Sequence, residues 1–187
     1  MYPFVRYVKE LLKYRKAPPL APTGVHISTH MCWPWDLDPW VELNNGRTLT
    51  LYDLGRIPLV IRTGLIHTLR QNRWGITVAG NSVRYRRRIR LFHRFTMVSR
   101  TMGWDERFFY IEQSMWMDGQ CCNQMLVRTA VTSDQGIVAP TRVMQAAGEN
   151  PESPALPDWV QAWIAADATR PWPPALPPEA EKAVATH

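Results

Sequence analysis

The sequence lacks the features of a secreted, membrane-spanning or zinc-binding protein. Among its 187 residues are only three cysteines, Cys32, Cys121 and Cys122, and an odd number with one adjacent pair forms neither a disulfide framework nor a zinc-ligand spacing. No stretch approaches the roughly 20 apolar residues of a membrane-spanning helix, and no apolar signal core followed by small residues stands near the start. We therefore expect a cytoplasmic protein without a bound metal.

The composition is that of a globular protein with one well-filled core. Hydrophobic residues make up 45% of the chain and charged residues 20%, which excludes a mainly disordered chain. The length suits one domain and is short for two. Nine tryptophans are many for this length, and such large rings line a core, a subunit interface or an apolar ligand cavity.

Positive charge is concentrated in two segments of a chain whose net charge is +6. Residues 1–16 contain five lysines and arginines against Glu10 alone, and residues 84–94 contain six arginines and no acid. Both segments suit an anionic partner. From residue 149 onward acids outnumber bases, so the C-terminal segment has the opposite sign.

The charge distribution and the positions of the prolines predict three segments. Residues 1–23 form a basic helix followed by a proline-rich linker, residues 24–148 form the main domain, and residues 149–187 form an acidic, proline-rich extension. The first helix has apolar residues at helical spacing among its lysines, so a weak contact with a membrane surface is one interpretation. Docking on its own domain is the more common behaviour of such a helix.

The order of elements predicts an α+β domain. A strand over residues 24–33 precedes a helical pattern over residues 45–71, in which Pro58 predicts a kink or break because proline has no amide donor. Asn44 or Asn45 is a suitable N-cap. Four strand-like segments and two short helices follow, at residues 74–88, 91–102, 107–117 and 121–132 and at 141–147 and 158–168. Turn residues at 103–106 and at Asp118-Gly119 make the strands antiparallel neighbours.

The segment before the long helix carries a family resemblance. It reads Trp-Asp-Leu-Asp-Pro-Trp-Val-Glu-Leu-Asn-Asn-Gly-Arg over residues 35–47, and it resembles the Asp-x-Asp…Asn-Asn signature of hot-dog thioesterases related to 4-hydroxybenzoyl-CoA thioesterase. The acid, small residue and arginine over residues 53–56 are similar to a further helix motif of that family. The resemblance implies a hot-dog fold, in which an antiparallel β-sheet wraps around a central α-helix, and a homodimer or dimer of dimers joined edge to edge.

The resemblance also implies hydrolysis of an acyl-CoA, with coenzyme A as part of the substrate and no separate cofactor. It assigns Asp38, the second acid of the pair, as the catalytic carboxylate, and Asp36 as the residue that orients the loop. The physical reasoning agrees, because a carboxylate before a helix start lies near unpaired amides and the positive end of the helix dipole. The amides of Asn45 or Gly46 would polarise the thioester oxygen, while Asp38 attacks the carbon or activates water.

One position departs from the family pattern. Many relatives have histidine where this chain has Glu42. Glu42 is a catalytic candidate as a base, but it could instead repel Asp38, or mark a protein that binds thioesters without cleaving them. These three interpretations stay open at this point.

Substrate-binding candidates lie on both sides of the helix start. Asn44 and Gly46 flank Asn45, and Asp53 either faces the cavity or pairs with Arg56 or Arg47. The run Arg86, Arg87 and Arg88 suits the phosphates of coenzyme A. The same run would suit nucleic acid, or would protect a sheet edge.

The sequence therefore predicts an acyl-CoA thioesterase. A non-catalytic acyl-CoA binding protein on the same fold is the alternative, and a polyanion binder that acts through the arginines is a further one. Nucleic acid is not an expected partner.

Overall fold

The computed structural model describes residues 2–177 and 179–181. The chain divides into two compact units, Met1–Pro154 and Ala155–His187. This division differs from the predicted segments 1–23, 24–148 and 149–187, because the N-terminal helix packs within the first unit. The second unit contains helix α5 (Asp158–Ala168), which agrees with the helix predicted over residues 158–168.

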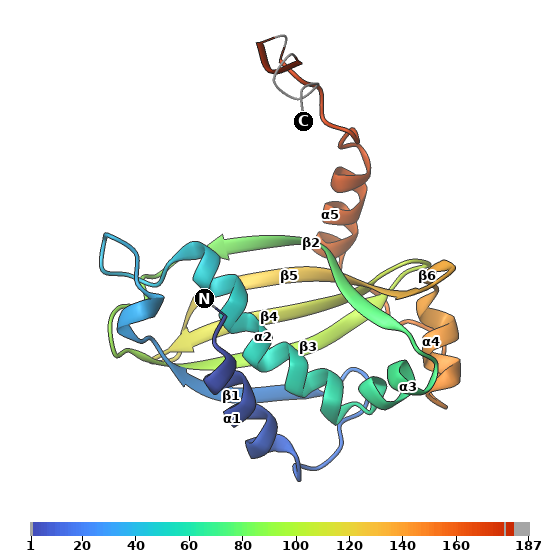
Figure 1. Ribbon diagram of the computed structural model, residues 1–187, viewed down its shortest axis with the longest axis horizontal. Helices are drawn as coiled ribbons and strands as arrows, with labels where there is room; N and C mark the ends of the chain where they lie inside the picture. Colours follow the sequence, from blue (N-terminus) through green and yellow to red (C-terminus); the bar gives the residue numbers. More distant parts are fainter. Residues whose placement is uncertain (1, 178, 182–187) are drawn as a thin grey trace. The chain divides into compact units, whose positions relative to one another are not determined.

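The described residues of the first unit contain one six-stranded antiparallel sheet and its helices (Figure 1). The strand order is β1-β3-β4-β5-β2, with β6 paired to β5. The strands are β1 (Val25–Met31), β2 (Gly75–Tyr85), β3 (Arg94–Trp104), β4 (Phe109–Met117), β5 (Gln120–Ser133) and β6 (Gly136–Val138). The α-helices are α1 (Phe4–Tyr14), α2 (Asn45–Arg62), α3 (Leu65–Gln71) and α4 (Pro140–Ala146), and a short 3-10 helix, η1 (Pro34–Asp36), follows β1.

Helix α2 lies across one face of the sheet (Figure 1). Its side chains Leu51, Tyr52 and Leu54 are completely buried, and they form the main core together with strand residues such as Phe95 and Met115. Burial of this apolar surface is the dominant favourable term for the helix, since its own sequence contains glycine and proline. The predicted α+β class, with a central helix on an antiparallel sheet, is confirmed.

The predicted break of this helix is misplaced. Helix α2 continues through Pro58, which is buried, and ends at Arg62. Gly64 then adopts φ 76°, in the left-handed region that glycine tolerates best, and α3 begins immediately after it. The local penalty of proline is offset because residues on both sides of Pro58 pack into the core.

The turns between the later strands differ in how well the sequence predicts them. Asp118 and Gly119 both have positive φ, 49° and 73°, as a two-residue hairpin turn requires, so the turn predicted there is confirmed. The turn predicted at residues 103–106 lies further along, because β3 continues to Trp104. It is held by Asp105, whose Oδ1 accepts hydrogen bonds from the amides of Arg107 and Phe108, both at 2.7 Å.

Strand β1 buries its polar face. His26, Ser28 and His30 point into the molecule, while Val25 and Ile27 are exposed. Burial, followed by nearby cations, lowers the pKa of His26 to about 4 and that of His30 to about 3. Both imidazoles are therefore neutral at physiological pH, and His30 Nε2 makes a 2.8 Å hydrogen bond with the Ser28 hydroxyl.

Gly55 marks the closest approach of α2 to the sheet, and it yields a stability prediction. A Cβ there would lie 2.5 Å from Ser99 Oγ and 2.6 Å from Met97 Sδ. Ser99 is held by a 2.8 Å hydrogen bond from Gln113, so it resists displacement. We expect Gly55→Ala to destabilise the protein by about 1–2 kcal/mol, because overpacking outweighs the gain in helix propensity.

Urea unfolding of Gly55→Ala checks this expectation. Gly46→Ala, in the first turn of the same helix, is the matched control, since its added Cβ meets only Asn44 Oδ1 at 3.3 Å. An increase in the free energy of unfolding of Gly55→Ala would contradict the close contact.

Candidate active site

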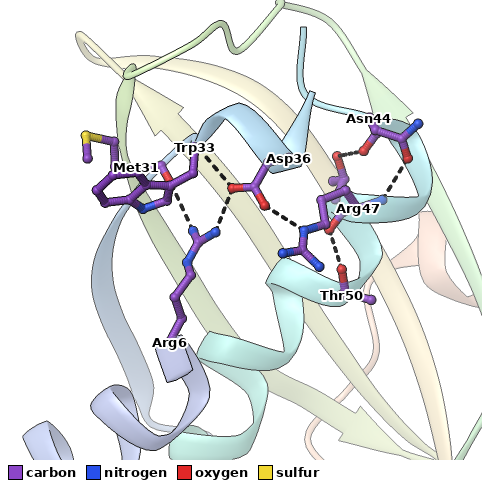
Figure 2. A network of polar contacts seen from close by, with 8 residues as sticks. Arg6, Met31, Trp33, Asp36, Asn44, Arg47 and Thr50 are labelled. Carbon is purple, nitrogen blue, oxygen red and sulfur yellow. Dashed lines mark hydrogen bonds and ion pairs between the residues drawn. The ribbon is translucent and has the colours of Figure 1, made fainter. Parts of the chain in front are cut away.

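The loop between β1 and α2 is built around the Asp36 carboxylate, which is fully buried. Figure 2 shows the network. Arg6 Nη1 and the Trp33 amide donate to Asp36 Oδ2 over 2.6 and 3.0 Å, and Arg47 Nε donates to Oδ1 over 2.6 Å. The Asp36 carbonyl accepts the Asn44 amide at 2.9 Å. Helix α1, the loop and α2 are thus joined at one side chain, in agreement with the orienting role predicted for Asp36.

The first amides of α2 have no partner within the helix. Asn44 is the N-cap, and its Oδ1 accepts the amide of Arg47 at 3.0 Å. The Thr48 amide and hydroxyl both donate to the Asn44 carbonyl. The amides of Asn45 and Gly46 stand at the very start of the helix, where no preceding helix carbonyl is available to accept them. They lie at the positive end of the helix dipole, where a developing oxyanion is stabilised.

Asp38 lies in a tight turn of the same loop and is half-buried. Its Oδ1 accepts the amide of Trp40 at 2.9 Å and that of Glu42 at 3.4 Å. Its own amide donates to the Glu42 carbonyl at 2.9 Å, and Val41, inside the turn, has φ 59°. One edge of the Asp38 carboxylate is therefore used to hold the turn, and the backbones of Asp38 and Glu42 are neighbours.

A cleft of about 200 Å³, here called the arginine cleft, adjoins the start of α2. Five predicted site residues line it together: Glu42, Asn45, Arg86, Arg87 and Arg88. Glu42 Oε2 forms a 2.8 Å ion pair with Arg88 Nε. Asp38 is not among the lining residues, although its turn is paired with the backbone of Glu42.

Three further residues of the arginine cleft, Thr48, Tyr85 and Asn123, were not predicted from the sequence. The Tyr85 hydroxyl donates to the Asn45 carbonyl at 3.4 Å. The pKa of Tyr85 is raised, because the effect of burial exceeds the opposite effect of a hydrogen bond with Thr48. Asn123 accepts a hydrogen bond from the buried Tyr52 hydroxyl. The position of Tyr85 among the arginines was a usable signal, whereas Asn123 comes from β5 and has no local one.

A larger cleft of about 1280 Å³, here called the apolar cleft, lies between α1, the end of β1 and the loop. Asn44 and Gly46 line it, so these two predicted substrate-binding residues are separated from the five predicted site residues of the arginine cleft. Its apolar walls include Phe4, Val5, Met31, Trp33, Trp35 and Leu37. At its inner side lie Glu10, whose pKa is raised by burial, and the neutral His30.

Asp53 lines neither cleft. It forms an ion pair with Arg56, one turn further along α2. Burial and the proximity of Asp53 raise the pKa of Tyr2 to about 12. Of the two interpretations of Asp53 from the sequence, the structure shows the ion pair. Within the described residues, no group of three His, Cys, Asp or Glu side chains is placed to hold a metal ion.

Comparisons with known proteins agree with this architecture. The family model described as "Thioesterase-like superfamily" matches residues 32–164. The chain belongs to the thioesterase-like superfamily. Protein THEM6 from Xenopus laevis is 30% identical over 165 residues, which are 86% of this chain and 78% of that relative. Protein THEM6 from Drosophila melanogaster is 30% identical over 139 residues, covering 72% and 69%.

A solved structure is similar to this chain in its fold. The probable thioesterase YbaW from Escherichia coli superposes with a TM-score of 0.62 at 15% identity, over 68% of this chain and 99% of that one. Together with the family match and the sheet around α2, this similarity confirms the hot-dog fold predicted from the sequence.

The Asp36 network yields a second stability prediction. Arg6 and Arg47 are only 15% and 12% exposed, so Asp36→Asn removes the negative charge that Asp36 supplies to two largely buried cations. Removing one partner of a buried ion pair typically costs 3–5 kcal/mol, and we expect a loss of about 3 kcal/mol in the free energy of unfolding, together with release of α1.

Denaturant unfolding and the rate of tryptic cleavage after Lys13 and Arg15 measure the two effects. Asp134→Asn, in the exposed turn between β5 and β6, is the control, and it should leave both unchanged. A variant at Asp36 with the stability and cleavage rate of the parent chain would show that the network does not hold α1.

Proposed function

We propose that this chain is an acyl-thioester hydrolase that acts on acyl-CoA. The observation that carries the proposal is the arginine cleft, where the helix-start residue Asn45 and three arginines converge beside the turn that holds the acid Asp38. A carbonyl-polarising site, an acid and a phosphate-binding group are the three parts that the reaction needs.

The proposed reaction begins with the thioester oxygen at the amides of Asn45 and Gly46. Asp38 then attacks the carbonyl carbon directly, or removes a proton from water that attacks it. In the direct route, the carbon–sulfur bond breaks as Asp38 forms a mixed anhydride with the acyl group, and water then cleaves this anhydride and restores the carboxylate. In the general-base route, the water oxygen adds to the carbonyl carbon, the carbon–sulfur bond breaks, and the proton held by Asp38 passes to the leaving thiolate. In both routes the hydroxyl of water ends on the released acid, and coenzyme A leaves as the thiol. The acyl group would lie along the apolar cleft, which begins on the other side of the same helix turn at Asn44 and Gly46.

The phosphates of coenzyme A are assigned to Arg86 and Arg87. Their side chains are exposed, while their amides donate to the Cys122 carbonyl at 2.8 and 3.0 Å and hold the segment in place. Arg88, the third arginine of the cleft, is less suitable for binding phosphate, because it already pairs with Glu42. Guanidinium groups bind phosphate through paired hydrogen bonds.

A homodimer is the proposed assembly. Strand β2 is an edge of the sheet and pairs only with β5 among the described strands. Its residues are mostly exposed, and an unpaired edge of this length favours pairing with another strand. The arginine cleft adjoins the end of β2, so a second copy paired there would lie beside the site. A dimer of dimers and a cytoplasmic location stay predictions.

A non-catalytic acyl-CoA binding protein is the second candidate. Two observations favour it: Glu42 is held by Arg88, and one oxygen of Asp38 is occupied by loop amides. Such a protein would bind acyl-CoA in the same clefts without turnover. Binding to other polyanions through the arginines stays a further prediction.

Asp38→Asn tests the catalytic proposal. The amide can still accept the loop hydrogen bonds but cannot act as nucleophile or base, so we expect kcat to fall by at least about 100-fold, with the KM and the melting temperature little changed. The measurement is thiol release from a panel of short, long and aromatic acyl-CoAs.

Asp118→Asn is the matched control, since it makes the same exchange in the β4–β5 turn, and it should retain full turnover. Equal rates for Asp38→Asn and the parent chain would remove Asp38 from the proposed role. Tight binding of acyl-CoA by calorimetry, without turnover of any member of the panel by the parent chain, would select the second candidate.

The double variant Arg86→Ala/Arg87→Ala tests the phosphate assignment. We expect its KM for acyl-CoA to rise about tenfold, which corresponds to 1.4 kcal/mol, since charge-assisted hydrogen bonds to phosphate are lost. Its KM for the matching acyl-N-acetylcysteamine thioester, which lacks phosphates, should be unchanged.

The control is Arg84→Ala/Arg90→Ala, which removes the same charge outside the lining of the arginine cleft. If both double variants raised the KM for acyl-CoA equally, the arginines would act only through their general positive field.

A further inference from the structure

Helix α1 is attached with its apolar side outward. Its four outer apolar side chains are 65%, 85%, 50% and 62% exposed, and they are Phe4, Val5, Val8 and Leu12. The side that faces the domain carries Glu10, which is only 2% exposed, the half-buried Arg6, Leu11 and Tyr14, and Tyr7, which packs against the main core. A helix on a globular protein normally buries most of its large apolar side chains, whereas the outer apolar face of α1 is left largely exposed by the described part of this chain.

The orientation of α1 is held by specific contacts. Arg6 Nη1 donates to Asp36 at 2.6 Å and Arg6 Nη2 donates to the Met31 carbonyl at 2.9 Å. Two turns further along, the Tyr14 hydroxyl donates to the Ile27 carbonyl at 3.1 Å, and its ring packs edge-on against His26 with centroids 4.5 Å apart. Turning the apolar residues inward would break these contacts, so the outer face is a stable feature.

Positive charge borders the outer apolar face. Lys9 and Lys13 are exposed on α1, and Arg15 and Lys16 follow directly after it. Arg6 is neutralised by Asp36, and Glu10, the sole acid of residues 1–16, is buried. The exposed surface of α1 therefore combines large apolar side chains with cations alone.

An aromatic side chain of the loop stands next to this surface. Trp35 is 65% exposed, and it lines the apolar cleft together with Phe4 and Val5. Tryptophan prefers the zone between lipid headgroups and acyl chains. None of the described helices is long and apolar enough to cross a bilayer, so contact through α1 would be with the surface.

We propose that α1 docks this protein on anionic lipid bilayers, with Phe4, Val5, Val8 and Leu12 inserted among the acyl chains and Lys9 and Lys13 at the headgroups. An apolar face bordered by lysine is the pattern of helices that lie in the membrane interface. Two copies of α1 packed face to face would instead bring like charges together. This inference does not require the proposed hydrolase activity, although Phe4 and Val5 also line the apolar cleft that is assigned to the acyl group.

Co-sedimentation of the full chain with phosphatidylcholine vesicles, with and without phosphatidylserine, tests the proposal. We expect binding to the phosphatidylserine vesicles that weakens as salt is added. Phe4→Ser/Val5→Ser/Val8→Ser should reduce this binding at least tenfold, and Lys9→Gln/Lys13→Gln should reduce it severalfold. Because the substituted residues are exposed, circular dichroism and thermal melting should match the parent chain.

Two control variants separate α1 from other surfaces. Val25→Ser/Ile27→Ser removes exposed apolar residues of β1, which are 44% and 56% exposed, and Arg86→Ala/Arg87→Ala removes charge from the arginine cleft. Both should bind the vesicles as the parent chain does. Loss of binding in the arginine variant alone would overturn the proposal, as would equal binding to vesicles without phosphatidylserine.

The molar mass in lipid-free buffer distinguishes a protein partner. A parent chain that binds no vesicles, or a serine variant that has a smaller oligomeric mass than the parent chain, would overturn the proposal. The second outcome would assign the outer face of α1 to contact between copies of this chain.

Discussion

A single buried carboxylate determines how the parts around the α2 start are arranged. Asp36 has no exposure to solvent, and a charge in that position is tolerated only with full compensation. Arg6 from α1 and Arg47 from α2 supply it. The ion pairs align the loop with the first turn of α2, place α1 against the domain with its apolar side outward, and form one wall of the apolar cleft. The geometry of both clefts therefore depends on this charge cluster.

The first turn of α2 serves two surfaces at once. Asn45 and Thr48 face the arginine cleft, whereas Asn44, Gly46 and Thr50 face the apolar cleft. A thioester has the same division, with a phosphate-bearing carrier on one side of the carbonyl and an apolar acyl group on the other. In the proposed reaction, the thioester carbonyl binds at the helix-start amides, between these two parts of the substrate.

The sequence predicted those features that arise from nearby residues. The Asn44 cap, the Asp118-Gly119 turn and the strands depend on local preference and alternation, and the family signature located the loop. The break at Pro58 was misplaced, because packing of the surrounding helix outweighs a local penalty. Arg6 and Asp36 are 30 positions apart, and Tyr52 and Asn123 are 71 apart. No local pattern encodes such pairs, so the arginine cleft could be predicted only in part.

The strand order also determines how the chain can reach this structure. β3, β4 and β5 are consecutive antiparallel neighbours, so their pairing closes only short loops. β1 pairs with β3 across the whole of α2 and β2, and β2 pairs with β5 across two intervening strands. Since closing longer loops costs more entropy, the central hairpins should assemble first and the two edge strands last. Both clefts involve segments next to those edges, so they are completed late in folding.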